Sequence, residues 1–221
     1  MKRLIIVCEG QTEQEFCNYI LQPHLIQFGI VVQNPTIKKT AGGIVNWASL
    51  KHQIETHLKQ DPTAFVTTLI DFYGIHANHN YPNWLQANQH NNKNIGMDLM
   101  EEAMLADIQV QLQSRFIPYI QLHEFEALIL ADARKLDWEY FEHEAAIASL
   151  VTMVGDTCPE LINDGAETAP SKRILKQIPE YDKVTAGWTV VEQIGLATLR
   201  HKCPHFNEWL TRLEQLGATG E

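Results

Sequence analysis

The sequence predicts an α/β fold in which a largely parallel sheet is flanked by helices and followed by a helical C-terminal part. Short apolar runs at residues 4–8, 30–32, 65–70 and 116–120 have the length of buried strands. Helical patterns lie between them, and alternating strands and helices imply right-handed crossovers in a parallel sheet. From Glu124 onward the pattern is mostly helical.

Side-chain spacing predicts where the helices lie. One helix is expected to begin near Thr12, because Thr12 and Glu15 have the spacing of a capping box. Apolar residues recur at helical spacing from about 45 to 59, and a further helix is expected from about 97 to 113. The Asn-rich segment 74–95 favours turns, so we expect a long surface loop or lid there.

Length and charge limit the class of protein. A chain of 221 residues can build one sizeable core, and we expect an α/β core over residues 1–135 with a helical part over 136–221 packed on it. The first apolar run is too short for a signal peptide or a membrane span, so a cytoplasmic protein is expected. The net charge of −10 argues against binding nucleic acid through the overall field. A metal-dependent nuclease remains open, because divalent cations can mediate phosphate contact.

Acidic residues stand where three of the predicted strands end. Glu9 follows the first strand, Asp71 follows the third, and Glu124 and Glu126 follow the fourth. Ligands of open parallel sheets bind beyond the carboxyl ends of the strands, so converging carboxylates there predict a Mg²⁺ or Mn²⁺ site. Taken singly, each acid could instead open a turn or a helix.

The two acids after the fourth strand are not equivalent. If residues 124–126 are extended, both carboxylates face one way, whereas in a helix they lie about 200° apart and only one reaches the site. Glu124 ranks first because it is nearer the strand end. His123 is a candidate ligand or proton carrier, or a histidine in a helix cap. Tyr73 is a candidate substrate contact, or a side chain packed on the sheet edge.

A second cluster, Ser171-Lys172-Arg173, follows Pro170. Ser171 can cap a helix, which places two cations in its first turn, the unfavourable end for positive charge. A bound anion such as a phosphate would explain that placement. Alternatively, Lys172 and Arg173 are a solvated basic pair on a helix with an apolar face, and the sequence does not favour either interpretation.

Four segments together, residues 8–13, 71–74, 123–128 and 168–173, resemble an uncharacterised bacterial family with a Toprim-like fold. Members of that family are often encoded beside ATPases in defence loci. The resemblance implies the metal-dependent phosphodiester chemistry of Toprim nucleases, topoisomerases and primases, with Glu9, Asp71 and Glu124 at matching positions.

The Toprim pattern Asp-x-Asp reads Asp71-Phe72-Tyr73 in this chain, so one carboxylate is missing from its usual place. Glu126 and Glu13 are the candidates to replace it. A site with a single metal, or with none bound productively, is the other alternative.

Two hypotheses follow. In the first, the chain is a Mg²⁺- or Mn²⁺-dependent nuclease or nuclease subunit, in which Glu9, Asp71 and Glu124 hold the metal and Lys172 or Arg173 stabilises the phosphate charge. In the second, it is a noncatalytic Toprim-like regulatory or sensor subunit of an ATPase complex. Nucleic acid, an ATPase and a second copy of the chain are the partners left open, and no membrane partner is expected.

Overall fold

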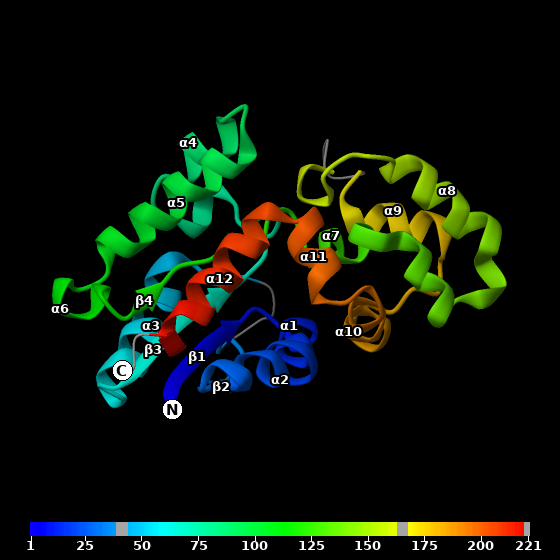
Figure 1. The fold of residues 1–221 in the computed structure, drawn as a ribbon. Coiled ribbons are helices and arrows are strands. Elements are labelled where there is room, and N and C mark those ends of the chain that lie inside the picture. The colour runs from blue at the N-terminus through cyan, green and yellow to red at the C-terminus, as the bar shows by residue number, and fades with distance from the viewer. Residues whose placement is uncertain (39–43, 163–167, 219–221) are drawn as a thin grey trace.

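The computed structural model describes residues 1–38, 44–162 and 168–218. Its centre is a four-stranded sheet in the order β2-β1-β3-β4, with every neighbouring pair parallel (Figure 1). The strands are β1 (Lys2–Cys8), β2 (Ile30–Gln33), β3 (Ala64–Leu69) and β4 (Phe116–Ile117). The predicted α/β class with a parallel sheet and C-terminal helices is therefore confirmed.

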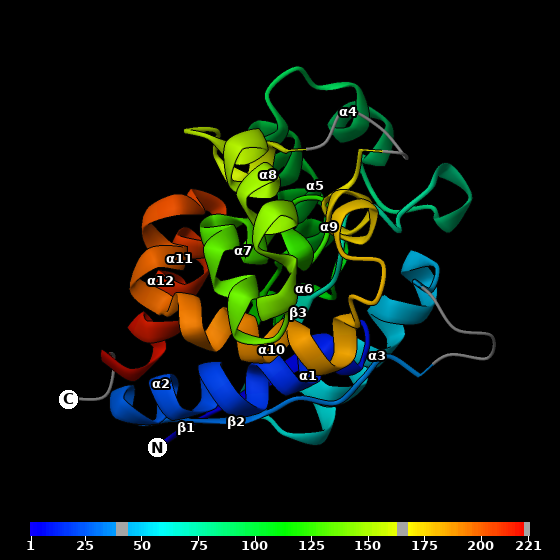
Figure 2. The same ribbon diagram turned by 90° about the vertical axis from the view of Figure 1, so that its right-hand side faces the viewer.

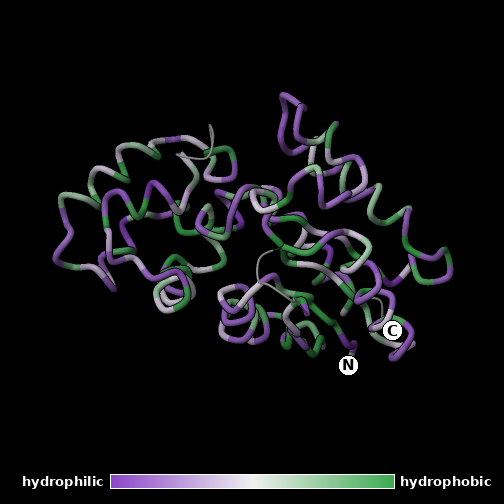
Figure 3. The backbone as a smooth tube through the Cα atoms, turned by 180° about the vertical axis from the view of Figure 1, so that it is seen from behind, coloured by the Kyte–Doolittle hydropathy of each residue, from purple (hydrophilic) through white to green (hydrophobic). Residues whose placement is uncertain are grey.

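Both faces of the sheet are buried, as expected for parallel strands covered by helices. Successive side chains of β1 point to opposite faces, so Leu4 and Ile6 join one hydrophobic cluster while Ile5 and Val7 join another. Figure 3 shows this strand in the hydrophobic colour and the outer turns of the surrounding helices largely in the hydrophilic colour.

Helices from the middle of the chain cover the second of these faces. Trp47, Leu50, Ile54 and Leu58 pack there from α3, and Met97, Met100 and Met104 pack there from α5. The elements of this region are α3 (Trp47–Gln60), η3 (Ala77–His79), α4 (Trp84–Gln89), α5 (Lys93–Asp107) and α6 (Val110–Gln113).

The first face is covered by helices from both ends of the chain. After β1 come α1 (Gln11–Phe16), the π-helix η1 (Cys17–Leu21), α2 (Gln22–Leu25) and η2 (Ile26–Phe28). The later elements are α7 (Glu126–Ile129), η4 (Leu130–Trp138), η5 (Phe141–His143), α8 (Glu144–Val154), η6 (Pro159–Leu161), α9 (Pro170–Gln177), α10 (Lys183–Ile194), α11 (Leu196–Lys202) and α12 (Pro204–Ala218).

The C-terminal helices share a core with the sheet. A single hydrophobic cluster contains Leu4 of β1, Leu150 of α8 and Leu210 of α12. Figure 1 shows α12 returning across the sheet, while α8 and α9 lie on the side away from α4 and α5. Among the described residues, no helix is both long enough and apolar enough to span a bilayer.

The structure departs from the sequence prediction in two places. The fourth strand ends at Ile117, because Pro118 has no N–H to donate, and pairing resumes only at the bridge between Asp71 and Gln121. The Asn-rich segment is not one long loop, since it contains α4 and the start of α5. Asn92 caps α5 by accepting hydrogen bonds from the N–H groups of the next turn. Asn is favoured at helix N-caps as well as in loops.

A buried cation joins α12 to the sheet. Nε2 of His205 lies 3.0 Å from Oε1 of Glu101 on α5, and the imidazole stacks on Tyr119 with ring centroids 5.1 Å apart. The carboxylate of Glu160 accepts the backbone N–H groups of His205 and Phe206 and so caps the first turn of α12. Burial alone would lower the pKa of His205, but the Glu101 hydrogen bond and the charges of Glu101 and Glu160 raise it to about 9.

This shift predicts a pH-dependent stability. A histidine whose pKa is raised by folding contributes stability that is complete below the unfolded pKa of 6.5 and is lost as pH rises through about 9. Between those limits, the unfolding free energy of the wild type should fall by up to about 3 kcal/mol more than that of His205→Gln. Urea unfolding at several pH values measures the difference, and parallel curves for the two proteins would contradict the assignment.

Candidate functional site

The ends of β1 and β3 bring the first two predicted acids together. The N–H of Glu9 donates to the carbonyl of Leu69 at 2.9 Å, which keeps the chain paired one residue beyond β1. Oε2 of Glu9 then accepts the backbone N–H of Asp71 at 3.0 Å. The expectation that strand ends would juxtapose Glu9 and Asp71 therefore agrees with the geometry.

A lysine that the sequence analysis did not select lies at the centre of this acidic region. Nζ of Lys183, the first residue of α10, is 3.3 Å from Oε2 of Glu126, 3.4 Å from Oδ2 of Asp71 and 3.5 Å from Oε1 of Glu13. It also lies 5.9 Å from the centroid of the Phe125 ring, within cation–π range. We call Glu9, Glu13, Asp71 and Glu126 with Lys183 the carboxylate cluster.

Close packing of α10 on α1 carries Lys183 to this position. Gly187 lies one turn after Lys183 on the same side of α10, and a Cβ there would come within 3.0 Å of Cγ2 of Thr12 and 3.3 Å of the Phe125 ring. Without that Cβ, the two helices approach closely, and Figure 2 shows α10 lying along α1. The ammonium consequently reaches acids that come from three other elements.

Glu13 enters the cluster because α1 begins earlier than predicted. The helix starts at Gln11 rather than Thr12, with Gly10 at its N-cap, so the third helical position is Glu13 and not Glu15. Oε2 of Glu13 accepts the N–H of Gly10 at 2.8 Å, which leaves Oε1 facing Lys183. The Glu13 residue is only 3% exposed.

Burial and neighbouring charges shift the pKa values of Asp71, Glu126 and Lys183. Burial raises the pKa of Asp71 well above its usual value, and Glu13, Glu9 and Glu126 raise it further while Lys183 opposes them. Burial also raises the pKa of Glu126 against the effect of Lys183. For Lys183, burial would lower the pKa, but the surrounding carboxylates outweigh it and raise the pKa well above normal. Lys183 is thus held as an ammonium among the carboxylates.

Glu126, rather than the first-ranked Glu124, contacts the cluster. His123 adopts a left-handed backbone with φ of 66°, and the helical turn of α7 begins three residues later. Glu126 therefore points from the first turn of α7 toward Lys183, whereas Glu124 points to α9. The helical alternative, in which only one of the two acids reaches the site, describes this geometry.

The carboxylate of Glu124 lies at the N-terminus of α9. The carboxylate of Glu124 accepts the backbone N–H of Ser171 at 2.9 Å and its hydroxyl at 3.1 Å. Nε of Arg173 donates to the carbonyl of Thr168 at 2.6 Å, and Lys172 is exposed. The anion expected beside Ser171 is thus the Glu124 side chain.

Tyr73 and His123, the two remaining predicted site residues, are joined by a backbone hydrogen bond. The N–H of Tyr73 donates to the carbonyl of His123 at 2.9 Å, which ties the chain after β3 to the turn before α7. His123 is 4% exposed, and Tyr73 is half-buried. Both border the carboxylate cluster in sequence, since Tyr73 follows Asp71 by two residues and His123 precedes Glu126 by three.

The carboxylate cluster has the donor chemistry of a divalent-metal site, with its cationic position filled by Lys183. Carboxylate oxygens are the ligands that Mg²⁺ and Mn²⁺ prefer. Oδ1 of Asp71 is buried and accepts no hydrogen bond from the described part of the chain. Within residues 1–38, 44–162 and 168–218, however, no three His, Cys, Asp or Glu side chains are arranged to hold a metal ion. Binding of a metal would therefore require the ammonium to leave.

Comparison with known proteins identifies the family. The profile described as "Domain of unknown function (DUF4276)" matches residues 8–214. The chain belongs to the DUF4276 family. No curated protein and no solved structure matches it. The matched range of DUF4276 includes every member of the carboxylate cluster, and it treats the sheet and the C-terminal helices as one unit.

Lys183 is placed in its helix as Lys172 and Arg173 are in theirs. It follows Asp182, whose side chain caps α10, so it is a cation in the first turn of a helix. The same unfavourable placement drew attention to Lys172 and Arg173. At Lys183 the compensating anions are Glu13, Asp71 and Glu126, which no local pattern reveals.

Removing the ammonium should destabilise the fold. Loss of one partner from a fully buried pair costs about 3–5 kcal/mol, but the Lys183 side chain is 35% exposed and partly screened, so we expect about 1–3 kcal/mol for Lys183→Met. Adding Asp71→Asn to that variant should recover part of the loss, because it removes one of the repelling charges. Denaturant unfolding at pH 7 and low salt measures both effects.

Lys176→Met is the matched control, since Lys176 is an exposed lysine at the end of α9 and should change stability by less than about 0.5 kcal/mol. A Lys183→Met protein as stable as the wild type would show that the ammonium does not hold the carboxylate cluster together.

Proposed function

We propose that this DUF4276 chain is a Mg²⁺- or Mn²⁺-dependent phosphodiesterase with a Toprim-like core, acting as a nuclease or a nuclease subunit. The observation that carries the proposal is the convergence of Glu13, Asp71 and Glu126 on one cationic position beside Glu9. That position lies at the carboxyl edge of a parallel sheet, where ligands of such folds bind.

The donor set consists of carboxylate oxygens, the ligands that a divalent ion prefers, and these oxygens would have to close around the ion in place of Lys183. Glu9, Asp71 and Glu126 would hold the metal, and Glu13 would take the place of the second Toprim aspartate that Tyr73 replaces. The buried Oδ1 of Asp71 is an oxygen still available as a ligand. A divalent ion bound there would supply an activated water and would neutralise phosphate charge.

Lys183 has two roles in this proposal. Its ammonium neutralises the carboxylates while no other cation is bound, which limits their mutual repulsion. Its stem is flexible and 35% exposed, so the ammonium can turn from the carboxylates toward an incoming phosphate and stabilise the charge that develops on it.

The neighbouring α9 supplies contacts to the rest of the substrate. Glu124 fixes the first turn of α9 through Ser171, and Arg173 fixes the segment before it. Lys172 is exposed in that turn and is the candidate to bind a phosphate of the polymer backbone. Tyr73 and His123 remain candidate substrate contacts at the border of the site.

The resemblance of the four sequence segments supports a biological context. Chains of the family that this one resembles are often encoded beside ATPases in defence loci, so we propose an ATPase as the partner. A partner of that kind would also contribute the basic surface for nucleic acid that a chain of net charge −10 does not provide overall.

A noncatalytic role is the second candidate, and Lys183 is the observation that favours it. An ammonium already satisfies the carboxylate cluster, and Tyr73 stands where the Toprim pattern has its second aspartate. A Toprim-like regulatory or sensor subunit of an ATPase complex needs no metal. In that role the cluster only fixes α10 against α1.

Cleavage assays test the catalytic proposal. The purified protein, alone and with the ATPase encoded beside it, is incubated with single- and double-stranded DNA and RNA in Mn²⁺. We expect Asp71→Asn and Glu126→Gln to lower the cleavage rate about a hundredfold or more, and Glu102→Gln, an exposed acid on α5, to leave it unchanged. Equal residual cleavage by the wild type and Asp71→Asn would overturn the assignment.

Calorimetric titration with Mn²⁺ separates the two candidates. If the cluster binds metal, Asp71→Asn should abolish binding, and Lys183→Met should bind Mn²⁺ at least about tenfold more tightly because the competing ammonium is gone. Mn²⁺ should then also restore the stability that Lys183→Met loses. The absence of binding by the wild type and by Lys183→Met at millimolar Mn²⁺ would favour the regulatory role.

A further inference from the structure

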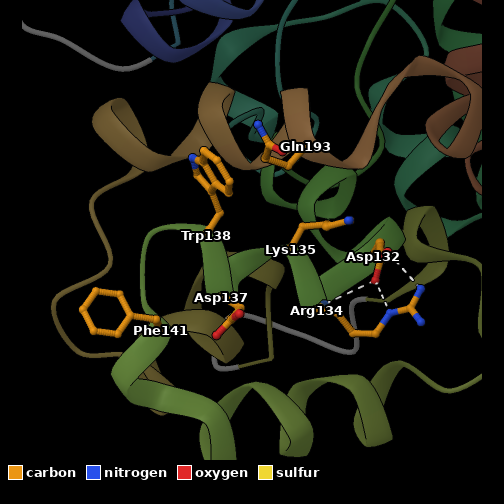
Figure 4. A pocket seen from close by; sticks show the side chains of 7 residues that line it. All are labelled: Asp132, Arg134, Lys135, Asp137, Trp138, Phe141 and Gln193. Atoms are coloured by element: carbon orange, nitrogen blue, oxygen red, sulfur yellow. Dashed lines mark hydrogen bonds and ion pairs between the residues drawn. The ribbon is translucent and has the colours of Figure 1, made fainter.

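A surface pocket of about 560 Å³ lies on the helical part of the chain, away from the carboxylate cluster. Figure 4 shows its lining, which comes from η4, η5 and α10. The side chains are those of Asp132, Arg134, Lys135, Asp137, Trp138, Phe141 and Gln193.

Two large aromatic side chains in this pocket are open to solvent. Trp138 is 65% exposed and Phe141 is 70% exposed, although most other aromatic residues of the chain pack in the two cores. In Figure 4 the Trp138 ring stands between Phe141 on one side and Lys135 on the other, with Gln193 beside it. Exposed aromatic rings in a concave polar surface are suited to stacking on a planar ligand.

The charges of the pocket are only partly paired. Arg134 makes a two-point ion pair with Asp132, at 2.6 Å from Nε and 2.9 Å from Nη2, and so leaves little charge for a ligand. Lys135 and Asp137 are both exposed, and within the described ranges neither makes an ion pair. The amide of Gln193 likewise makes no hydrogen bond to a described residue. In Figure 4 Asp137 points away from Trp138, so one ammonium and one amide remain available near the Trp138 ring.

We propose that this pocket binds a nucleotide. The base stacks on Trp138, Gln193 meets the hydrogen-bonding edge of the base, and Lys135 binds the phosphate. Stacking on an aromatic side chain accepts any base, whereas a side-chain amide such as that of Gln193 can pair with the N6 and N7 atoms of adenine. The proposal goes beyond the phosphodiesterase function, because it requires neither a metal nor cleavage.

Helix α10 connects this pocket with the carboxylate cluster. Lys183 is its first residue and Gln193 is ten positions later, a separation of about 15 Å along the axis at about 1.5 Å per residue. A nucleotide in the pocket is therefore too far away to be the scissile residue. It is either a free nucleotide that acts as an effector or a nucleotide further along a single strand.

Calorimetry in EDTA tests the pocket independently of any metal site. The probes are AMP, UMP, adenosine, ribose 5-phosphate and a single-stranded dA12 oligonucleotide. We expect AMP to bind more tightly than UMP, and ribose 5-phosphate to bind weakest because it has no base. Trp138→Ala should weaken AMP binding about tenfold or more, while Trp138→Phe, which keeps a ring, should retain most of it.

The phosphate contact has its own control. Lys135→Met should weaken AMP up to about fivefold but leave adenosine unchanged, and Lys176→Met, an exposed lysine outside the pocket, should change neither. Tighter binding of dA12 than of AMP, with the same loss in Trp138→Ala, would identify a polynucleotide as the source. Equal binding would identify the free nucleotide.

Three results would overturn the proposal. The first is the absence of binding by every probe at millimolar concentration, and the second is AMP binding that Trp138→Ala leaves intact. The third is self-association that depends on Trp138, measured by sedimentation, in a protein that binds no nucleotide, because it would assign this surface to a second copy of the chain. None of these results bears on Mn²⁺-dependent cleavage, so the two proposals fail separately.

Discussion

Charge balance around Lys183 is the constraint on which the site depends. Glu9, Glu13, Asp71 and Glu126 approach one another where the strands end, and burying like charges together is costly unless a cation offsets them. The required ammonium lies on α10, more than a hundred positions after Asp71 in the sequence, so α10 must pack against α1 closely enough to deliver it. The missing Cβ of Gly187 permits that approach. The geometry of the carboxylates and the docking of α10 therefore stabilise each other.

The same division of charge recurs on the other side of the core. His205 of α12 donates a hydrogen bond to Glu101 of α5, as Lys183 places its ammonium beside acids that precede it in the chain. In both places the cation belongs to the C-terminal helices, and the carboxylates that its nitrogen contacts precede residue 135. These helices thus complete the electrostatics of the sheet as well as its hydrophobic core. That dependence gives a physical reason for a family profile that extends over residues 8–214.

The parts of the structure that the sequence predicts are those determined by local patterns. Apolar runs of strand length located β1 and β3, and the rule for parallel sheets then placed Glu9 and Asp71 at one edge. The choice between Glu124 and Glu126 depends on the left-handed backbone of His123, a conformation that is uncommon for any residue other than glycine and is therefore not expected from the sequence. Lys183 was missed because its partners are distant in sequence. The Asn-rich segment misled because Asn favours helix caps as well as loops.

A resident ammonium makes the proposed metal and substrate sites depend on each other. The oxygens of Asp71 and Glu126 that contact Lys183 are the oxygens a divalent ion would take, so ion and ammonium compete for the same place. A phosphate that arrives at the site offers the ammonium a new anionic partner within reach of its stem. Phosphate binding would then free carboxylate oxygens to hold the metal, and a bound metal would free the ammonium for the phosphate. By reciprocity, each should strengthen the other. In a purely regulatory protein, the same lysine would stay with the carboxylates whatever phosphate is present, so the position of one side chain separates the two functions.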